Sequence, residues 1–489
     1  MKRIAWLALV AAATLSGCAK PAPEQQIVND AAEALGGRDR ILAVRTLVIE
    51  GEGINGNLGQ DMTPEAAGQR FEITGYRRVV DVPAGRARTE QTRTPNFTFF
   101  QGQAPQKQVQ GVDGDVGYNV AANGNASRVA TAVAKDRRVE LHHHPVTIVR
   151  AALNPAAKLS NPRTSEGEDV VDVTTAEGLD FTLAIDSTTR LPTRVVSMAS
   201  NANLGDVAIE TSFVDYQEVA GLKLPARLTT RTDTVTTVDI RVTKQAVDGE
   251  VGDLAAPAAA ASAAPIAGPA PATVSAEEIA KGIWYLAGQS HHSVLVEFDD
   301  HLTLIEAPQH EVRTAAVMAK AKELRSDKPL THVVVTHHHF DHSGGVRAAM
   351  AEGLTIVTHR TNVPFFEALA KRSFTIEPDA FAKNPRPAKI EGVDDELVLT
   401  DSTKSMTVTL YHVAGSPHGD TILMAHFPRE RVLVQADVFS PGGAVAPYAA
   451  NLLENVTKRK LRIDRIVPLH GGIVPFAEFV KAAKAGAAS

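Results

Sequence analysis

The stretch THHHFDHSGG, Thr336–Gly345, places four histidines and one aspartate within seven positions. It follows the apolar run Val333–Val335, which predicts a buried β-strand that ends just before the first histidine. Gly344 and Gly345 allow the backbone to turn tightly into a following helix. We therefore expect a strand, a loop rich in metal-binding side chains and a helix, in this order.

The spacing within this loop predicts two sets of metal ligands. Alternate positions of an extended loop project to one side, so His337 and His339 can bind one ion together. Asp341 and His342 lie where the chain turns and face a second position. Neutral imidazole and carboxylate groups suit zinc, and also manganese or iron.

Three later residues supply the ligands that this loop lacks. His418 lies in a glycine-containing turn between two predicted strands, whereas Asp437 and His470 each follow the end of one. Open α/β sheets gather their sites at the carboxyl ends of strands, so all three are candidate ligands.

Residues 274–489 alternate predicted strands and helices, which is typical of an α/β layer structure. Helices are predicted at Thr314–Leu324 and Val346–Ala351. Strands are predicted at Val294–Phe298, Leu302–Ile305, Thr331–Val335, Leu354–Val357, Met406–His412, Thr421–Ala425, Arg431–Val434 and Arg465–Pro468. Phe365–Val398, rich in charge and proline, predicts a helix and an irregular loop over the site.

This ordered set of ligands resembles the metallo-β-lactamase superfamily, whose members are mostly hydrolytic metalloenzymes with a four-layer αββα sandwich. The resemblance covers roughly residues 274–485. It implies two metal positions, with His337, His339 and His418 at the first, Asp341, His342 and His470 at the second, and Asp437 bridging both.

The resemblance also implies a mechanism. A hydroxide shared by two zinc ions, with iron or manganese as alternatives, would attack the substrate, and Asp341 would act catalytically by orienting it. A bridging aspartate at position 437 resembles the esterase, glyoxalase II, lactonase and phosphodiesterase branches. The expected substrate is therefore a small molecule with an ester, lactone, thioester or amide bond. β-Lactam hydrolysis is disfavoured, because one subclass of zinc β-lactamases carries cysteine where this chain has Asp437.

Further residues are predicted around the centre. Glu306 stands where the family usually has an aspartate, and we expect it to support the site or cap the structure without binding metal. His291 and His292 either line the substrate pocket or are plain loop residues. Tyr448 and Asn451 lie on a later loop that could face substrate.

Two alternative functions remain open on the sequence. The same ligand set could hold a single iron in a redox enzyme of this fold. The chain could instead be chiefly a carrier of a hydrophobic ligand, with its N-terminal half as the working part.

An alanine- and proline-rich segment at residues 249–273 marks a domain boundary, because such a composition cannot form a core of its own. It predicts a semi-rigid linker between a domain at residues 24–248 and the metal-binding domain at 274–489.

The N-terminal domain is predicted to be β-rich. A helix at Ile27–Leu35 precedes strands at Thr46–Glu50, Arg78–Val82, Val170–Thr174, Asp180–Ile185, Arg194–Met198 and Thr234–Val242. The features Ala34–Gly37, Leu183–Asp186, Leu191–Arg194 and Gly221–Pro225 resemble periplasmic lipoprotein-carrier half-barrels, which implies a curved sheet around a helix and a lipid or other hydrophobic ligand. His142–His144 is expected to be a polar loop before a helix at Val146–Leu153, not a metal site.

The first residues predict export. Lys2 and Arg3 precede the apolar run Ile4–Leu15, which has the length of a signal sequence and is short of a membrane span. Leu15–Cys18 resembles the bacterial lipobox, so residues 1–18 are expected to be a lipoprotein signal peptide that ends at an acylated Cys18. We expect a periplasm-facing lipoprotein anchored in the cell envelope, with Ala19 favouring the outer membrane.

Composition excludes one class of partner. The 489 residues carry a formal net charge of -6, with a pI of about 6.3, and have no basic cluster. Nucleic-acid binding proteins usually present a basic patch, so no nucleic-acid partner is expected.

Overall fold

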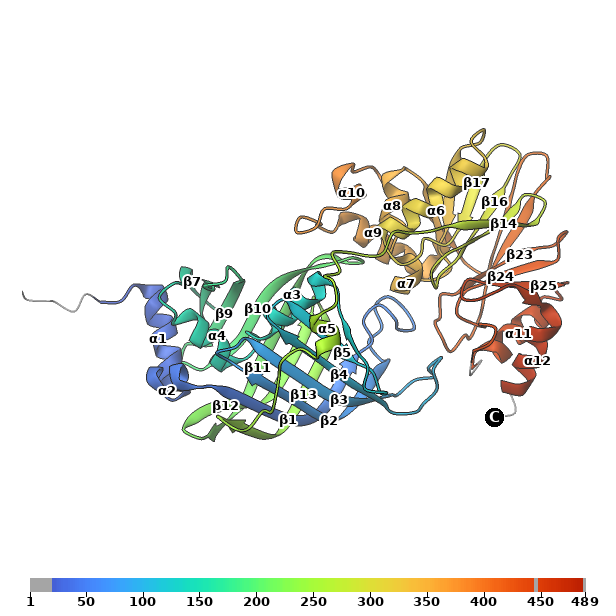
Figure 1. Cartoon of the computed structure of the whole chain (residues 1–489). Coiled ribbons are helices and arrows are strands. Elements are labelled where there is room, and N and C mark those ends of the chain that lie inside the picture. The colour runs from blue at the N-terminus through green and yellow to red at the C-terminus, as the bar shows by residue number, and fades with distance from the viewer. Residues whose placement is uncertain (1–19, 444–446, 487–489) are drawn as a thin grey trace, which may run out of the picture.

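The computed structural model describes residues 20–443 and 447–486. Within them the chain forms two domains that lie side by side (Figure 1). The predicted signal peptide and its Cys18 lie outside the described residues. In the described parts of the chain, no helix is both long and apolar enough to cross a membrane.

One large antiparallel sheet makes up most of the N-terminal domain. In chain order its strands are β1 (Thr46–Gly56), β2 (Arg70–Asp81), β3 (Arg86–Pro95), β4 (Gln106–Asp113), β5 (Val116–Val120), β6 (Ala126–Arg128), β7 (Lys158–Ser165), β8 (Glu168–Thr174), β9 (Asp180–Asp186), β10 (Pro192–Asn201), β11 (Gly205–Val219), β12 (Leu222–Thr232) and β13 (Val235–Val247). They pair in the order β6-β5-β4-β3-β2-β1-β13-β12-β11-β10-β9-β8-β7. β6 and β7 are its two edges, so the sheet is open, which confirms the half-barrel-like prediction.

Each predicted strand of this domain coincides with part of a sheet strand to within one residue, but several further strands were not predicted. β3 reads RARTEQTRTP and has few apolar residues to mark a period of two. Some of its polar side chains form hydrogen bonds across the sheet, as where Arg93 donates to Gln106 at 2.9 Å. Pairing with the neighbouring strands β2 and β4 therefore forms a strand that its own sequence pattern does not signal.

Four helices accompany the sheet: α1 (Pro23–Leu35), α2 (Arg38–Ala43), α3 (Thr131–Glu140) and α4 (Pro145–Ala152). α1 begins with Pro23, whose fixed φ suits the first helical position, and ends at Gly36, whose φ is +132°. A Cβ at Gly36 would lie 2.2 Å from the carbonyl oxygen of Gly221, so the helix end packs directly on the sheet. Val28 of α1 and Val149 of α4 are fully buried in the domain core.

The histidines His142–His144 do not form the polar loop that was expected. His143 and His144 are buried, and His143 contacts the hydroxyls of Thr211 and Ser197 at 2.8 and 2.9 Å. The Nδ1 atom of His144 accepts from the backbone of Val146 and caps α4. Burial lowers the pKa of both imidazoles to about 3, so they are neutral members of the core.

The alanine- and proline-rich segment 249–273 packs against the N-terminal domain and includes the short helix α5 (Ala258–Ala261). Leu254 is 4% exposed and packs with Val48 and Val79 of the sheet. Arg128 donates to the carbonyl of Ala263 at 2.8 Å. The segment therefore connects the two domains, and part of it is packed on the N-terminal sheet.

Two sheets form the centre of the C-terminal domain. The first contains β14 (Ser275–Ala280), β15 (Ile283–Ala287), β16 (Ser293–Glu297), β17 (Leu302–Ile305), β18 (Leu330–Val334), β19 (Thr355–His359) and β20 (Lys389–Val393), paired in chain order. The second contains β21 (Glu396–Thr400), β22 (Thr407–His412), β23 (Leu423–Phe427), β24 (Val432–Gln435), β25 (Arg465–Pro468) and β26 (Val474–Pro475), also paired in chain order. β17 to β20 are parallel, and so are β24 and β25.

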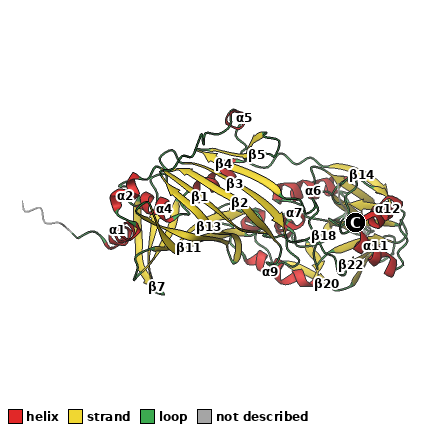
Figure 2. Cartoon of the chain, turned by 90° about the horizontal axis from the view of Figure 1, so that it is seen from below, coloured by secondary structure: helices red, strands yellow, loops and turns green. Residues whose placement is uncertain are grey.

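Helices cover the outer faces of both sheets (Figure 2). They are α6 (Glu311–Leu324), α8 (Val346–Ala351), η1 (Arg360–Asn362), α9 (Val363–Lys371), α10 (Ala380–Lys383), α11 (Ala449–Lys458) and α12 (Phe476–Gly486), whereas the short α7 (Phe340–Ser343) follows the loop after β18. Side chains of both sheets, such as Val296 and Leu423, share the central core. Val317 of α6 and Leu452 of α11 belong to separate outer cores, so the layers stack as αββα, as predicted.

Phe365–Val398 is more regular than predicted. Its second half contains β20, at the edge of one sheet, and the start of β21, at the edge of the other. Edge strands can carry many charged residues because one side is exposed, which explains why this part of the segment was interpreted as an irregular loop.

Polar contacts fix the two domains to each other at several points. Asp206 accepts hydrogen bonds from the backbone and hydroxyl of Thr375 at 2.8 and 2.6 Å. Arg372 pairs with Asp233. The Tyr448 hydroxyl donates to the carbonyl of Thr98 at 2.7 Å. These contacts define the position of the N-terminal domain beside the C-terminal one.

The neutral core histidine predicts a pH effect on stability. Folded His143 stays neutral down to about pH 3, whereas an unfolded histidine is protonated below about pH 6.5. Its contribution to stability is therefore complete above pH 6.5 and falls by about 1.4 kcal/mol per pH unit below it. Urea unfolding of the sheet, followed by circular dichroism at pH 7 and pH 5, should show a shallower loss for His143→Gln than for the wild type. Equal losses would contradict a neutral buried His143.

Candidate metal centre

The strand and loop order expected around Thr336–Gly345 is present. β18 ends at Val334, residues 335–339 form the loop, and α7 carries Asp341 and His342. His337, His339 and His342 are completely buried. The buried parallel strands thus bring a histidine-rich loop into the interior of the domain, where charged or polar groups need partners.

The first group of candidate ligands joins His337, His339, His418 and Asp437, whose ligand atoms all lie within 4.8 Å of one another. Nε2 of His418 lies 3.0 Å from the Asp437 carboxylate, and Nε2 of His337 lies 3.5 Å from it. Nε2 of His337 and Nδ1 of His339 are buried and have no hydrogen-bond partner among the described residues. Buried imidazole nitrogens without partners fit a metal ion, which would use their lone pairs.

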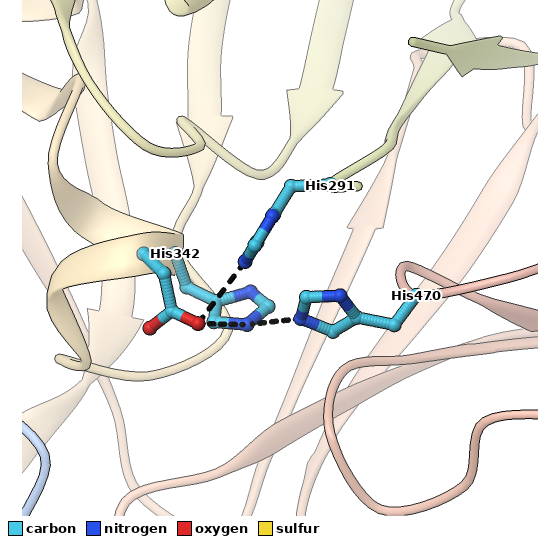
Figure 3. Close-up of side chains that lie close together, drawn as sticks. His291, His342 and His470 are labelled. Atoms are coloured by element: carbon cyan, nitrogen blue, oxygen red, sulfur yellow. Dashed lines mark hydrogen bonds and ion pairs between the residues drawn. The ribbon is translucent and has the colours of Figure 1, made fainter. Parts of the chain in front are cut away.

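The second group joins His291, Asp341, His342 and His470 within the same 4.8 Å limit. The three imidazoles converge on one point in Figure 3. Nε2 of His291 lies 3.0 Å from Oδ2 of Asp341, and Nε2 of His470 lies 3.0 Å from Nε2 of His342. Three imidazoles and one carboxylate are a ligand set that suits zinc, iron or manganese.

Asp437 connects the two groups. One carboxylate oxygen faces His418 and His337 of the first group. The other lies 3.0 Å from Nε2 of His342 and 2.8 Å from Nε2 of His470. The residue follows β24 with a φ of +62°, a left-handed conformation that aspartate adopts more readily than most residues. Its carboxylate therefore contacts histidines of both groups.

Hydrogen bonds from the Nδ1 atoms orient two of the imidazoles, His342 and His470, so that their Nε2 atoms face the centre. His342 donates from Nδ1 to the buried carboxylate of Glu306 at 2.8 Å, which leaves Nε2 directed at the centre. His470 donates from Nδ1 to the carbonyl of Ser290 at 2.9 Å. Glu306 also accepts from the backbone and hydroxyl of Thr336. Glu306 therefore supports a ligand without joining either group, in the supporting role expected from the sequence.

The carboxylates and imidazoles of the cluster shift one another's pKa. Burial alone would raise the pKa of Asp437, but His342 and hydrogen bonds from neighbouring histidines hold it well below its usual range. Burial lowers the pKa of His337 and His339, so both are neutral. Burial also acts to lower the pKa of His342, but the carboxylates around it raise it above the ordinary value. Metal binding at His342 would therefore release a proton.

The other predicted pocket residues lie around this cluster. Nδ1 of His292 accepts from the backbone of Gly288 at 3.1 Å, and its ring lies 5.1 Å from that of Tyr285. The ring of Tyr448 lies 5.0 Å from that of His418. Asn451 donates to the carbonyls of Ala414 and Gly415 at 3.0 and 3.1 Å, so it supports the turn that carries His418.

The sequence did not assign His291 to a group of candidate metal ligands. It was considered for the pocket or as a plain loop residue, whereas its Nε2 belongs to the second group. Its Nδ1 contacts the Ser290 hydroxyl at 2.8 Å, which fixes the ring. The adjacent pair His291-His292 before a buried strand was the available signal, but only the fold shows which of the two faces the centre.

Removing the charge of Glu306 should weaken the metal centre. In Glu306→Gln, one acceptor oxygen becomes an NH2 donor, so the side chain cannot keep all three hydrogen bonds from the backbone and hydroxyl of Thr336 and from His342, and the support of His342 is weakened. Loss of such a supporting group typically costs about 10- to 100-fold in metal affinity. Competition with a chromogenic chelator measures this change. The control is Glu323→Gln, at an exposed glutamate paired only with Lys320 in the described structure. Unchanged zinc affinity in Glu306→Gln would contradict the role of Glu306.

Comparison with known proteins agrees with this geometry. Residues 287–475 match the family model of the metallo-beta-lactamase superfamily. Solved structures similar to the chain include a metallo-beta-lactamase from Pontibacter korlensis, with 14% identity, a TM-score of 0.35 and coverage of 44% of this chain and 100% of that one. They also include a metallo-beta-lactamase from Hirschia baltica, with 17% identity, a TM-score of 0.34 and coverage of 43% and 96%.

A third similar structure is the metallo-beta-lactamase FIM-1 from Pseudomonas aeruginosa in its mono-zinc form, with 17% identity, a TM-score of 0.33 and coverage of 45% and 96%. No curated protein matches the chain. The family match spans the αββα layers and both groups of histidine and aspartate side chains, so residues 287–475 have the fold of the metallo-beta-lactamase superfamily and are similar to it in sequence.

Proposed function

We propose that the chain is a metal-dependent hydrolase that uses two zinc ions, with iron or manganese as alternative metals. The observation that carries this proposal is the pair of ligand groups that share Asp437. His337, His339 and His418 would hold the first ion. Asp341, His342 and His470 would hold the second, with His291 as a further ligand on the same side.

The ions, when bound, supply Lewis-acid activation of a carbonyl group and a water molecule of lowered pKa. Side chains of the protein would orient the attacking water. Asp341 has one oxygen facing His291 and the second group, so it is the carboxylate placed to orient an attacking water. Its pKa, which burial would raise, is lowered by His342 and by hydrogen bonds from His291 and Gln60, so it stays ionised.

The proposed substrates are small molecules with an ester, lactone, thioester or amide bond. Support comes from the aspartate at position 437, which resembles the branches that cleave such bonds. Phosphodiesterase action on RNA is not favoured because the net charge of -6 gives no basic surface for a polyanion. β-Lactams belong in the substrate screen as the less favoured class.

The N-terminal domain supports a second role, the binding of a hydrophobic ligand. It contains a cavity of about 550 Å³ lined by apolar residues such as Leu47, Ile49 and Val80 and by polar groups of His143 and Thr211. A cavity of this volume can hold a small organic ligand. The domain could thereby bind a lipid or present a substrate to its neighbour.

We further propose that acylated Cys18 anchors the protein in the cell envelope, facing the periplasm. The support is the lipobox-like sequence Leu15–Cys18 after an apolar run. In a Gram-negative host, the full chain should fractionate with outer membranes, whereas Cys18→Ala should not incorporate labelled palmitate and should leave the membrane fraction. Equal membrane fractionation and labelling of both chains would contradict the anchor.

Metal content tests the proposed function directly. The chain purified from residue 19 should contain about two zinc ions by elemental mass spectrometry, and His337→Ala/His339→Ala should lose most of them. His301→Ala/His332→Ala is the matched control, because these neighbouring histidines lie outside both groups. Ester and lactone hydrolysis should fall by at least about 100-fold in the ligand variant alone.

Other outcomes would redirect the proposal. A single iron per chain would favour the redox alternative. Metal content equal to that of the ligand variant, even after reconstitution, would overturn the hydrolase and make the N-terminal cavity the candidate working site.

A further inference from the structure

The loop between β1 and β2 of the N-terminal domain, residues 57–69, reaches the metal ligands of the C-terminal domain. The side-chain amide of Gln60 donates to Oδ1 of Asp341 at 2.8 Å. The carbonyl oxygen of Asp61 accepts from Nε2 of His339 at 2.9 Å. The carbonyl of Met62 accepts from the backbone of Asp420 at 2.9 Å. Successive residues of one loop therefore contact both ligand-bearing loops.

The loop is internally braced, so these contacts have a defined geometry. The carboxylate of Asp61 accepts from the backbone of Met62 at 2.6 Å and of Gln69 at 2.7 Å. The amide of Asn57 donates to the carbonyl of Gln60 at 3.0 Å. Asp61 is only 5% exposed. A segment with these internal bonds can hold its outward groups in place, as a support for metal ligands requires.

The contacts of Gln60 and Asp61 leave one oxygen of Asp341 and one ring nitrogen of His339 available for a metal ion. A carbonyl only accepts, so Nε2 of His339 must carry the proton and Nδ1 keeps its lone pair. That Nδ1 is buried and has no hydrogen-bond partner in the described part of the chain, and His339 is a member of the first group. Gln60 occupies Oδ1 of Asp341, and Oδ2 remains directed at the second group.

The loop is also fixed against the backbone of the metal-binding segment. Phe340 donates from its backbone to the carbonyl of Gly59 at 3.2 Å. A Cβ at Gly59, whose φ is +71°, would lie 2.4 Å from the Phe340 ring. The approach at Gly59 is therefore too close for any other residue without movement of the loop.

We propose that residues Gly59–Met62 of the N-terminal domain are part of the metal centre, with Gln60 as a positioning residue for Asp341 and the Asp61 carbonyl as the group that orients His339. The centre is then completed only when both domains are in place. This inference rests on the proposed function insofar as the two groups bind metal.

Stepwise zinc binding to the full chain, measured by competition with a chromogenic chelator, tests the role of Gln60. In Gln60→Leu the amide that holds Asp341 is lost at nearly constant size. The zinc ion held by the second group should bind at least about tenfold more weakly, while the first ion changes by less than about threefold. Gln217→Leu, at an exposed glutamine of β11, is the control and should bind both ions as the wild type does.

The outcomes separate the two proposals. If the wild type binds no zinc, the proposed function fails. If the wild type and Gln60→Leu bind two ions with equal constants, the hydrolase stands and the role of Gln60 is overturned. Weakening of both ions together with a lower melting temperature of the zinc-free chain would show a folding defect and would also overturn the positioning role.

A second pair of variants tests the loop without changing a polar group. Gly59→Ala introduces a Cβ that meets the Phe340 ring, so zinc affinity should fall at least about tenfold. Gly85→Ala carries a similar positive φ of +62° but has no atom within 4 Å of the new Cβ, and it should bind zinc as the wild type does. Equal zinc affinity of the two variants would contradict the contribution of the loop.

Discussion

The carboxylate of Asp437 is the group on which the rest of the metal centre depends. Four imidazoles, those of His337, His342, His418 and His470, lie within 3.5 Å of its two oxygens. A nearly buried carboxylate is costly unless it is paired, and so many basic partners meet that requirement. The same arrangement brings both groups of candidate ligands against the two oxygens of one carboxylate.

The αββα layers make this convergence possible. β18 delivers the histidine-rich loop from one sheet, whereas β24 and β25 deliver Asp437 and His470 from the other. Glu306 follows β17 with a φ of +87° and supports His342 from behind. Since the buried sheets are rigid, the ligands need little reorganisation to meet an ion.

The N-terminal sheet contributes to the same site from outside the αββα domain. Its β1–β2 loop contacts Asp341 and His339, and polar pairs such as Asp206 with Thr375 hold the two domains together. A separate binding module would need no such contacts with metal ligands. The arrangement couples the integrity of the centre to the domain that also contains the large cavity.

The αββα fold and seven candidate ligands could be predicted from the amino-acid sequence. His337, His339, Asp341 and His342 are local in the chain, with a spacing set by backbone geometry, and His418, Asp437 and His470 follow predicted strands in the order that the family resemblance implies. That His291 joins the second group and that His143 is buried could not be predicted, because both depend on partners far along the chain. Strand β3 was missed for a different reason: its polar sequence lacks an apolar alternation, although it pairs with the neighbouring strands β2 and β4. The contacts of Gln60 and Asp61 with the centre are seen only in the folded chain, because a loop some 280 residues from its partners carries no local pattern of that contact.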